Sequence, residues 1–303
     1  MIRFRLGTRG SPLALTQAAM VRDALCAAHG WLAEEIETVV IRTTGDRVQD
    51  RALAEIGGKA LWTKELDRAL LDREIDACVH SMKDVETVRP GSIAIAAMLP
   101  RADVRDRLIG AESIAALPHG AVIGTSSPRR RAQLLRTRPD LTVITFRGNV
   151  DTRLAKLAAG EVDATLLAAA GLDRLGRAEI GVAIATDAML PAPAQGAVGI
   201  EVRMDDEIAA VLVGAIDDRA TSLCVNTERA LLAALKADCH SPVAALAALA
   251  GETLSLRAEL IAEDGAGSVT GAIEGGLSDP LGPALAHDLL DRAPEAVRRL
   301  FAA

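Results

Sequence analysis

The chain has few aromatic residues and no excess of positive charge, and both shortages restrict what it can bind. Its 303 residues include two Trp, three Phe and no Tyr, and the formal net charge is −7. Proteins hold nucleic acid through stacking on aromatic side chains and through a broad positive field. We therefore expect no nucleic-acid partner.

Long apolar runs and ordered cysteine spacing are also missing. Half of the residues are hydrophobic, yet no apolar run is long enough to span a bilayer. Residues 1–5 lead into polar, proline-containing sequence and not into a secretory leader. We expect a cytoplasmic location without a membrane partner. The four cysteines have no regular spacing, so we expect neither a disulfide framework nor a metal site.

Strand and helix patterns alternate over the first two thirds of the chain. The expected strands are 2–6, 35–41, 76–80, 93–98, 122–124, 142–146, 163–168 and 197–202. The expected helices are 12–29, 62–72, 129–136 and 150–159. This alternation predicts an α/β fold with a mostly parallel sheet. The Pro-rich stretch at 190–196 is expected to be a hinge or crossover.

The last third has a different pattern. A long helix at 219–235 is followed by a polar loop at 237–242, which contains Cys239. Two strands and a helix come after it, at 253–261, 268–274 and 279–291. Strands in sequence with a helix behind them predict a small α+β domain.

Arginines recur where expected strands turn into helices. Arg129 and Arg130 fall in the first turn of a helix that Ser127 can cap, and Arg9 precedes the cap residue Ser11 in the same way. A cation at this end of a helix costs a few tenths to about 1 kcal/mol unless an anion is bound there. Arginine favours planar carboxylates or phosphates. The alternative is a set of solvated surface arginines.

Asp84 and Cys239 are the two candidate reactive residues. Asp84 follows Lys83 just after a short apolar run, so it is either a surface ion pair or the acid of a basic pocket. In a pocket it would stabilise a developing cation or move protons. Cys239 lies in a polar loop, whereas Cys26, Cys78 and Cys224 fall within expected helices or strands and are expected to pack in the core.

These motifs, taken together, resemble the porphobilinogen deaminase family, also called hydroxymethylbilane synthases, over nearly the whole chain. The matching segments are TRGSPLAL at 8–15, GGK at 57–59, HSMKD at 80–84, GTSSPRR at 124–130, RGNV at 147–150, TRL at 152–154, GLDRLG at 171–176, QGAVGIE at 195–201 and the loop at Cys239.

The resemblance implies a fold and an activity. It implies two α/β domains like the halves of a periplasmic binding protein, 1–97 with 198–216 and 98–197, with a cleft between them. A third, α+β domain, 219–303, would carry the cysteine. Such proteins are monomeric cytoplasmic transferases of tetrapyrrole biosynthesis, including that of porphyrins and heme. They join four porphobilinogens head to tail, release ammonia from each, and hydrolyse the product as hydroxymethylbilane.

The resemblance also implies site roles. Cys239 would hold a dipyrromethane cofactor through a thioether, as a primer that the enzyme builds from its own substrate. Asp84 would be catalytic, contacting pyrrole N–H groups, supporting the positive azafulvene left by ammonia and carrying protons. The cations that would pair with acetate and propionate groups are Arg9, Lys83, Arg129, Arg130, Arg147, Arg153 and Arg174. Lys59 would lie on a mobile loop over the cleft. Polar support would come from Ser11, Ser81, Thr125, Ser127 and Gln195.

The chain departs from the family pattern at a few positions. They are Glu55 in place of a loop lysine, Trp62 in place of Phe, Glu86 in place of a proline, Asp173 in place of a basic residue and Asp238 in place of a glycine. The first two leave the role of the loop open, and the last leaves the geometry at Cys239 open.

Two other functions compete with this interpretation. One is a non-catalytic, two-lobed solute-binding protein for a polycarboxylate, which would need no reactive cysteine and would usually carry an export signal. The other is a regulator with a ligand-sensing domain, which would need a DNA-binding helix pair that neither terminus provides.

Overall fold

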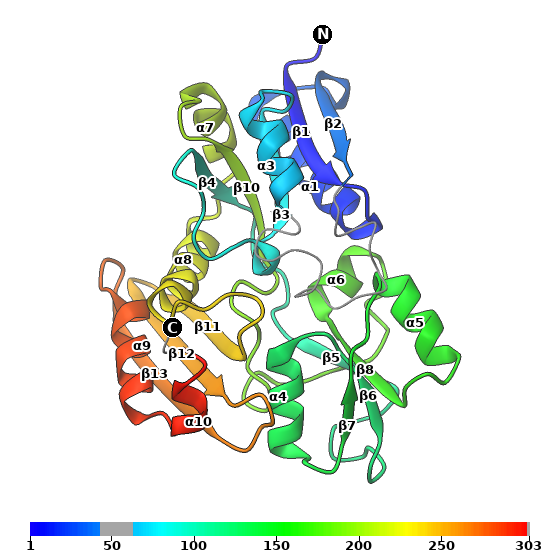
Figure 1. Cartoon of the computed structure of the whole chain (residues 1–303). Coiled ribbons are helices and arrows are strands. Elements are labelled where there is room, and N and C mark those ends of the chain that lie inside the picture. Colours follow the sequence, from blue (N-terminus) through cyan, green and yellow to red (C-terminus); the bar gives the residue numbers. More distant parts are fainter. Residues whose placement is uncertain (43–62, 302–303) are drawn as a thin grey trace. The chain divides into compact units, whose positions relative to one another are not determined.

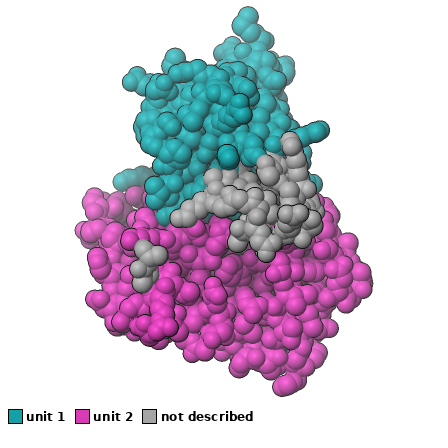
Figure 2. Space-filling view, in the orientation of Figure 1, with its two compact units in different colours: residues 1–102, 196–222 teal, residues 103–195, 223–303 magenta. Residues whose placement is uncertain are grey.

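The computed structural model describes residues 1–42 and 63–301. By its internal contacts the chain forms two compact units (Figure 2). Unit 1 contains residues 1–102 and 196–222, and unit 2 contains 103–195 and 223–303. No helix in the described part of the chain has the length and apolar character needed to cross a membrane.

Unit 1 is built on a five-stranded sheet with the order β2-β1-β3-β10-β4 (Figure 1). Strands β2, β1 and β3 run parallel, and β10 is antiparallel to both of its neighbours. The strands are β1 (Phe4–Arg9), β2 (Ile36–Ile41), β3 (Ala77–Ser81), β4 (Ile93–Met98) and β10 (Val198–Arg203). The helices are α1 (Pro12–His29), α3 (Lys64–Leu71) and α7 (Glu207–Gly214), and 3-10 turns occur at Ala33–Glu35 and Met82–Asp84.

Strand β3 is buried on both faces because helices cover both sides of the sheet. Val79 belongs to the cluster that includes Leu25 of α1, whereas Cys78 belongs to the cluster that includes Leu66 of α3. Successive side chains of a strand point to opposite faces, so a strand that is buried on both faces has a continuous run of apolar residues. This burial fixes the polar residues that follow β3 at one edge of the sheet.

Unit 2 repeats this plan in a second sheet with the order β7-β6-β8-β5-β9. Strands β7, β6 and β8 are parallel, and β5 is antiparallel to both of its neighbours. The strands are β5 (Asp106–Ile109), β6 (Val122–Gly124), β7 (Thr142–Ile144), β8 (Ala164–Ala168) and β9 (Val182–Ala183). The helices are α4 (Pro128–Thr137), α5 (Val150–Ala158) and α6 (Ala169–Arg174).

A three-stranded antiparallel sheet completes unit 2. It has the order β11-β12-β13 and packs with helices α8 and α9 around a shared apolar core that includes Leu231, Leu256 and Leu289. The strands are β11 (Val243–Ala250), β12 (Thr253–Ile261) and β13 (Ser268–Gly276). The helices are α8 (Arg219–Ala234), α9 (Leu281–Arg292) and α10 (Glu295–Arg298).

The predicted fold class is confirmed. Both larger sheets are mostly parallel, since one strand of five is reversed in each, and the C-terminal part is the expected small α+β structure. Strands β5, β9 and β11 and helices α6, α7 and α10 were not predicted. The domain limits 1–97 with 198–216, 98–197 and 219–303 stay a prediction, as does a cleft.

Candidate functional site

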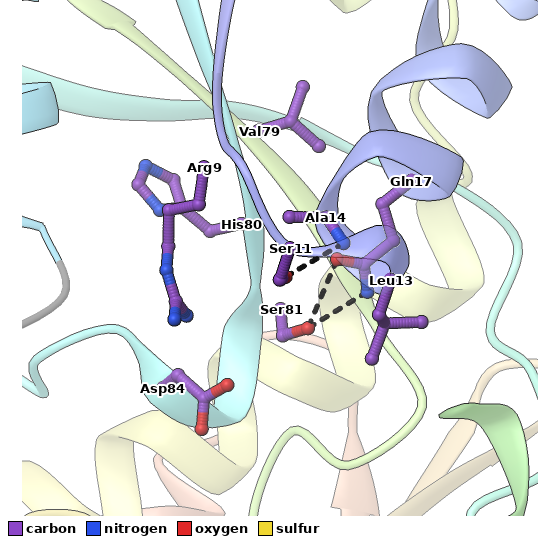
Figure 3. Close-up of a pocket in the computed structure, with 9 residues that line it drawn as sticks. All are labelled: Arg9, Ser11, Leu13, Ala14, Gln17, Val79, His80, Ser81 and Asp84. Atoms are coloured by element: carbon purple, nitrogen blue, oxygen red, sulfur yellow. Dashed lines mark hydrogen bonds between the residues drawn. The ribbon is translucent and has the colours of Figure 1, made fainter. Parts of the chain in front are cut away.

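A pocket in unit 1 lies where β1, α1 and β3 meet (Figure 3). Strands β1 and β3 are parallel neighbours, so the residues at their carboxyl ends share one edge of the sheet, the usual place for a site in an open α/β sheet. The lining residues are Arg9, Ser11, Leu13, Ala14, Gln17, Val79, His80, Ser81 and Asp84. Four of the predicted site residues, Arg9, Ser11, Ser81 and Asp84, are thus brought together.

The amino end of α1 forms one wall of this pocket. Ser11 is the N-cap and accepts a hydrogen bond from the amide of Ala14 at 3.3 Å, and Pro12 opens the helix, as predicted. The first turn holds no acidic residue. The positive end of the helix dipole and the cation of Arg9 therefore both favour an anionic ligand.

Gln17 and His80 line the pocket but were not predicted. The side-chain amide of Gln17, which is 3% exposed, lies 2.8 and 3.2 Å from Oγ of Ser81 and fixes that hydroxyl. A glutamine four residues after Leu13, on the buried face of α1, was the available sequence signal. His80 was part of the HSMKD segment, but nothing in the sequence indicated that its side chain contacts Glu201 of β10.

Asp84 is half-buried, and its carboxylate forms no hydrogen bond or ion pair with any residue that the structure describes. In Figure 3 the side chain of Arg9 extends toward it. Lys83 precedes Asp84 in the 3-10 turn Met82–Asp84 and does not line the pocket. The carboxylate is therefore available to a ligand.

Unit 2 contains a second polar cluster, around Asp106 of β5. Its carboxylate lies 2.8 Å from Nη2 of Arg129 and 2.7 Å from Nη2 of Arg130, and it accepts a hydrogen bond from Gln195 at 2.9 Å. Arg129 also donates to the carbonyl of Leu190, and Arg130 to that of Leu166. Three predicted site residues thus share one carboxylate that was not predicted.

The cluster is buried and carries one more positive than negative charge. Arg129 and Arg130 are 3% and 6% exposed. Burial raises the pKa of Asp106, but the two guanidiniums outweigh burial and hold that pKa well below its usual range. Burial lowers the pKa of Arg129. Within the described residues, Nε of both arginines is buried without a hydrogen-bond partner. Their pairing with ligand carboxylates stays a prediction.

Further predicted residues follow the parallel strands β6, β7 and β8. Thr125 follows β6 and its hydroxyl accepts from the amide of Ser127 at 3.2 Å, and Ser127 caps α4. Arg147 follows β7, and its buried Nη1 has no hydrogen-bond partner in the described part of the chain. Nε of Arg153 donates to the carbonyl of Gly148 at 3.0 Å. Arg174 ends α6, where burial lowers its pKa.

Cys239 lies in the loop between α8 and β11 and is exposed, whereas Cys78 and Cys224 are buried and Cys26 is half-buried. Burial raises the pKa of the Cys78 thiol strongly, which makes it unreactive. The carboxylate of Asp238 accepts from the amide of His240 at 2.9 Å and closes the loop as an Asx turn. Asp238 has no positive φ, so the loop does not require the glycine expected from the family.

Other departures from the family pattern also have partners. Glu86 accepts from the hydroxyl of Thr63 at 2.6 Å, and Asp173 pairs with Arg107 at 2.8 Å. Lys59, Glu55 and Trp62 lie outside the described residues.

The structure places basic residues at the ends of parallel strands, the carboxylate of Asp84 in a pocket and the thiol of Cys239 on an exposed loop. These features define an α/β protein suited to an acidic ligand and to covalent chemistry at sulfur. Two family models match the chain. "Porphobilinogen deaminase, dipyromethane cofactor binding domain" covers residues 4–210, and "Porphobilinogen deaminase, C-terminal domain" covers 222–291. The chain belongs to the porphobilinogen deaminase family.

Curated relatives agree with this assignment. The chain is 56% identical over 307 residues to a porphobilinogen deaminase of Sphingopyxis alaskensis, covering 98% of this chain and 96% of that one. It is 52% identical to a porphobilinogen deaminase of Paracoccus denitrificans, covering 96% and 94%.

Solved structures are similar only distantly. A periplasmic substrate-binding protein of an ABC transporter from Coxiella burnetii has a TM-score of 0.42 at 16% identity, covering 73% of this chain and 94% of that chain. A periplasmic binding protein of Salmonella typhimurium with high arginine specificity has a TM-score of 0.40 at 12% identity, with coverage of 73% and 94%. These values are too low to favour the solute-binding function over the family match.

Proposed function

We propose that this protein joins four porphobilinogen molecules head to tail into hydroxymethylbilane and releases ammonia from each, as a transferase of tetrapyrrole biosynthesis. The observation that carries the proposal is the family match over residues 4–210 and 222–291. The proposed working form is a cytoplasmic monomer with porphobilinogen as its small-molecule substrate. Its three domains would be 1–97 with 198–216, 98–197 and 219–303.

The residues present fit a dipyrromethane cofactor. Cys239 is the exposed cysteine among the four, and it is the proposed point of thioether attachment. The acidic side chains of the cofactor would be held by the basic residues at the carboxyl ends of β6, β7 and β8. When bound, the cofactor supplies the pyrrole carbon to which the first substrate is joined.

Substrate carboxylates are the proposed ligands of the cations. Each porphobilinogen brings an acetate and a propionate, so a growing chain needs several guanidiniums. Arg147, whose buried Nη1 has no hydrogen-bond partner within residues 1–42 and 63–301, is suited to a bidentate carboxylate contact. The other proposed contacts are Arg9, Lys59, Lys83, Arg129, Arg130, Arg153 and Arg174, with polar support from Ser11, Ser81, Thr125, Ser127 and Gln195.

Asp84 is the proposed catalytic residue. Positive charge develops on the substrate pyrrole as ammonia leaves, and a carboxylate nearby lowers the free energy of that charged state. The same carboxylate can accept a pyrrole N–H hydrogen bond and take up a proton after the carbon–carbon bond has formed. Its lack of a partner among the described residues leaves it available for both tasks.

Intact-mass spectrometry of the purified protein tests the cofactor assignment. The wild type is expected to carry the mass of a covalent dipyrromethane, and Cys239→Ser is expected to lack both that mass and turnover. Cys26→Ser is the matched control and should keep the adduct, because Cys26 is half-buried within α1. An equal adduct on Cys239→Ser and the wild type would refute attachment at Cys239.

A further inference from the structure

The segment that carries Asp84, residues 80–89, is held on both sides of this carboxylate. Asp84 itself has no partner among the described residues. On its amino side, Ser81 is held by Gln17, and the amide of Met82 donates to the carbonyl of Ala197 at 3.1 Å. Sδ of Met82 also fills the space beside Gly199, 2.0 Å from where a Cβ would stand.

One buried carboxylate, that of Glu201 on β10, contacts both ends of this segment. At one end, Nε2 of His80 lies 3.1 Å from Oε2 of Glu201, in a close polar contact without hydrogen-bond alignment. At the other end, Nε and Nη2 of Arg89 donate to the two oxygens of Glu201 at 2.7 and 3.0 Å. The Glu201 side chain has no exposed surface.

The register of the sheet explains this contact. His80 pairs with Gly199 and Cys78 pairs with Glu201 across β3 and β10, so Glu201 lies on the same face as His80, toward α3. Gly199 has no side chain on that strand, which leaves room for Met82. The strand pairing therefore brings a carboxylate that lies 112 residues after Arg89 into contact with the segment that carries Asp84.

Arg89 extends the connection to α3. It contacts Asp67 of α3 and Glu86 at 2.5 Å each, and its side chain is 7% exposed. Thr63 donates to the other oxygen of Glu86. Burial raises the pKa of Glu201, but its contacts with His80 and Arg89 outweigh burial and set that pKa to about 2, so this carboxylate is ionised at neutral pH.

We propose that Glu201 is a positioning residue that fixes Asp84 by holding both ends of its segment, through His80 and through Arg89. This proposal rests on the proposed catalytic role of Asp84. It assigns to Glu201 no contact with substrate. A displacement of Asp84 by a fraction of an ångström weakens a contact that strengthens as positive charge develops, so the effect should fall mainly in kcat.

The test compares two buried arginines of unit 1. Glu201→Gln and Arg89→Lys are each expected to lower kcat for porphobilinogen consumption by about tenfold or more, with KM changed by less than about threefold. Arg203→Lys is the matched control. Arg203 has a 5% exposed side chain, lies on β10 like Glu201, and bonds to the Leu70 and Ile75 carbonyls and to Asp206 without contacting residues 80–89. Arg203→Lys should lower thermal stability and leave kcat unchanged.

A double-mutant cycle separates positioning from general loss of structure. If Glu201 acts through Asp84, Glu201→Gln added to Asp84→Glu should lower kcat by less than it does in the wild type. Full additivity would overturn the proposal, as would wild-type kcat in both Glu201→Gln and Arg89→Lys. If Glu201→Gln is not recovered folded, Arg89→Lys decides by the same criteria.

Asp84→Asn distinguishes the failure of this proposal from that of the proposed function. Wild-type turnover in Asp84→Asn would overturn the catalytic role of Asp84 and the positioning role of Glu201 together. An inactive Asp84→Asn combined with fully active Glu201→Gln and Arg89→Lys would overturn only the positioning role.

Discussion

Asp106 neutralises one of two guanidiniums that are buried side by side, and in the described part of the chain no other carboxylate contacts Arg129 or Arg130. The two guanidiniums carry like charges and contact the same carboxylate, so they repel each other strongly in a medium of low polarity. The side chains of the first turn of α4 therefore depend on a residue that lies 23 positions earlier in the chain.

Replacing Asp106 by Asn should destabilise the fold by about 3–5 kcal/mol, because it leaves buried charge without compensation. The measurement is urea unfolding at neutral pH. Asp288→Asn provides the comparison, since the Asp288–Arg292 pair is exposed and its loss should change stability little. Equal effects of the two substitutions would contradict the role given to Asp106.

The difference in stability between the wild type and Asp106→Asn should depend on pH. Because the folded-state pKa of Asp106 is depressed, its contribution is complete above the unfolded pKa of about 3.9 and is lost as pH falls toward the folded value. The stability gap between wild type and Asp106→Asn is expected to be constant from neutral pH to about 5 and to shrink below about 4. A gap that widened on acidification would show the opposite sign of linkage.

At the level of single residues, the sequence indicated the candidate cations but not the carboxylates that contact them. Arg9, Ser11, Ser81 and Asp84 line one pocket, because they lie at or just after the ends of neighbouring parallel strands, and their role in a site stays a prediction. Asp106 and Glu201 could not be assigned in the same way. Each reaches its arginine from a strand that runs against its neighbours, and strand order across a sheet is not encoded in local pattern.

Among the elements, the helices that begin at basic turns depend on their caps. In α4 the hydroxyl of Ser127 accepts from the amide of Arg130 at 3.4 Å, and the first turn holds no acidic residue. The cap is therefore the local feature that offsets two cations at the positive end of the helix dipole.

Ser127→Ala should lower the free energy of unfolding by about 1 kcal/mol, the usual cost of a lost N-cap. Ser127→Asp should restore it, since aspartate caps equally well and adds a favourable charge beside Arg129 and Arg130. Thermal and urea unfolding measure both. An alanine variant as stable as the wild type would mean that the cap adds nothing in this context.

Capped helices were predicted closely, although strands β4, β6 and β12 were predicted to the residue at both ends. Helix α1 (Pro12–His29) was predicted at both ends, and α4 and α5 were predicted within one residue of their starts. Strand β11 was missed because its sequence, VAALAALA, is rich in Ala and lacks β-branched and aromatic residues after its first position. Strand β9 has two residues and exists only through its pairing with β5.

For the whole molecule, a net charge of −7 has to be reconciled with the proposed local attraction for the carboxylates of the substrate. Such attraction acts over short distances and is screened by salt when the cations are partly exposed. Raising NaCl from about 0.05 to about 0.5 M should therefore raise KM for porphobilinogen severalfold and change kcat less. Initial-rate measurements decide this, and a KM independent of salt would argue against carboxylate pairing by the half-exposed arginines.

The larger organisation followed from the sequence in part. Alternating strands and helices predicted a mostly parallel α/β sheet, and the change of pattern near residue 219 predicted the small α+β structure. The division of the α/β part into two sheets was expected only from the resemblance to the family. The return of residues 198–203 to the first sheet was expected only from the resemblance to the family, because a strand's pattern does not state which sheet it joins.

The packing of Met82 against Gly199 has a consequence for protein engineering. Alanine at position 199 would place its Cβ 2.0 Å from Sδ of Met82, so the buried Met82 side chain would have to move to admit it. A shorter residue at position 82 would remove that overlap. Gly199→Ala should therefore be tolerated better when it is combined with a shorter residue at position 82 than when it is introduced alone.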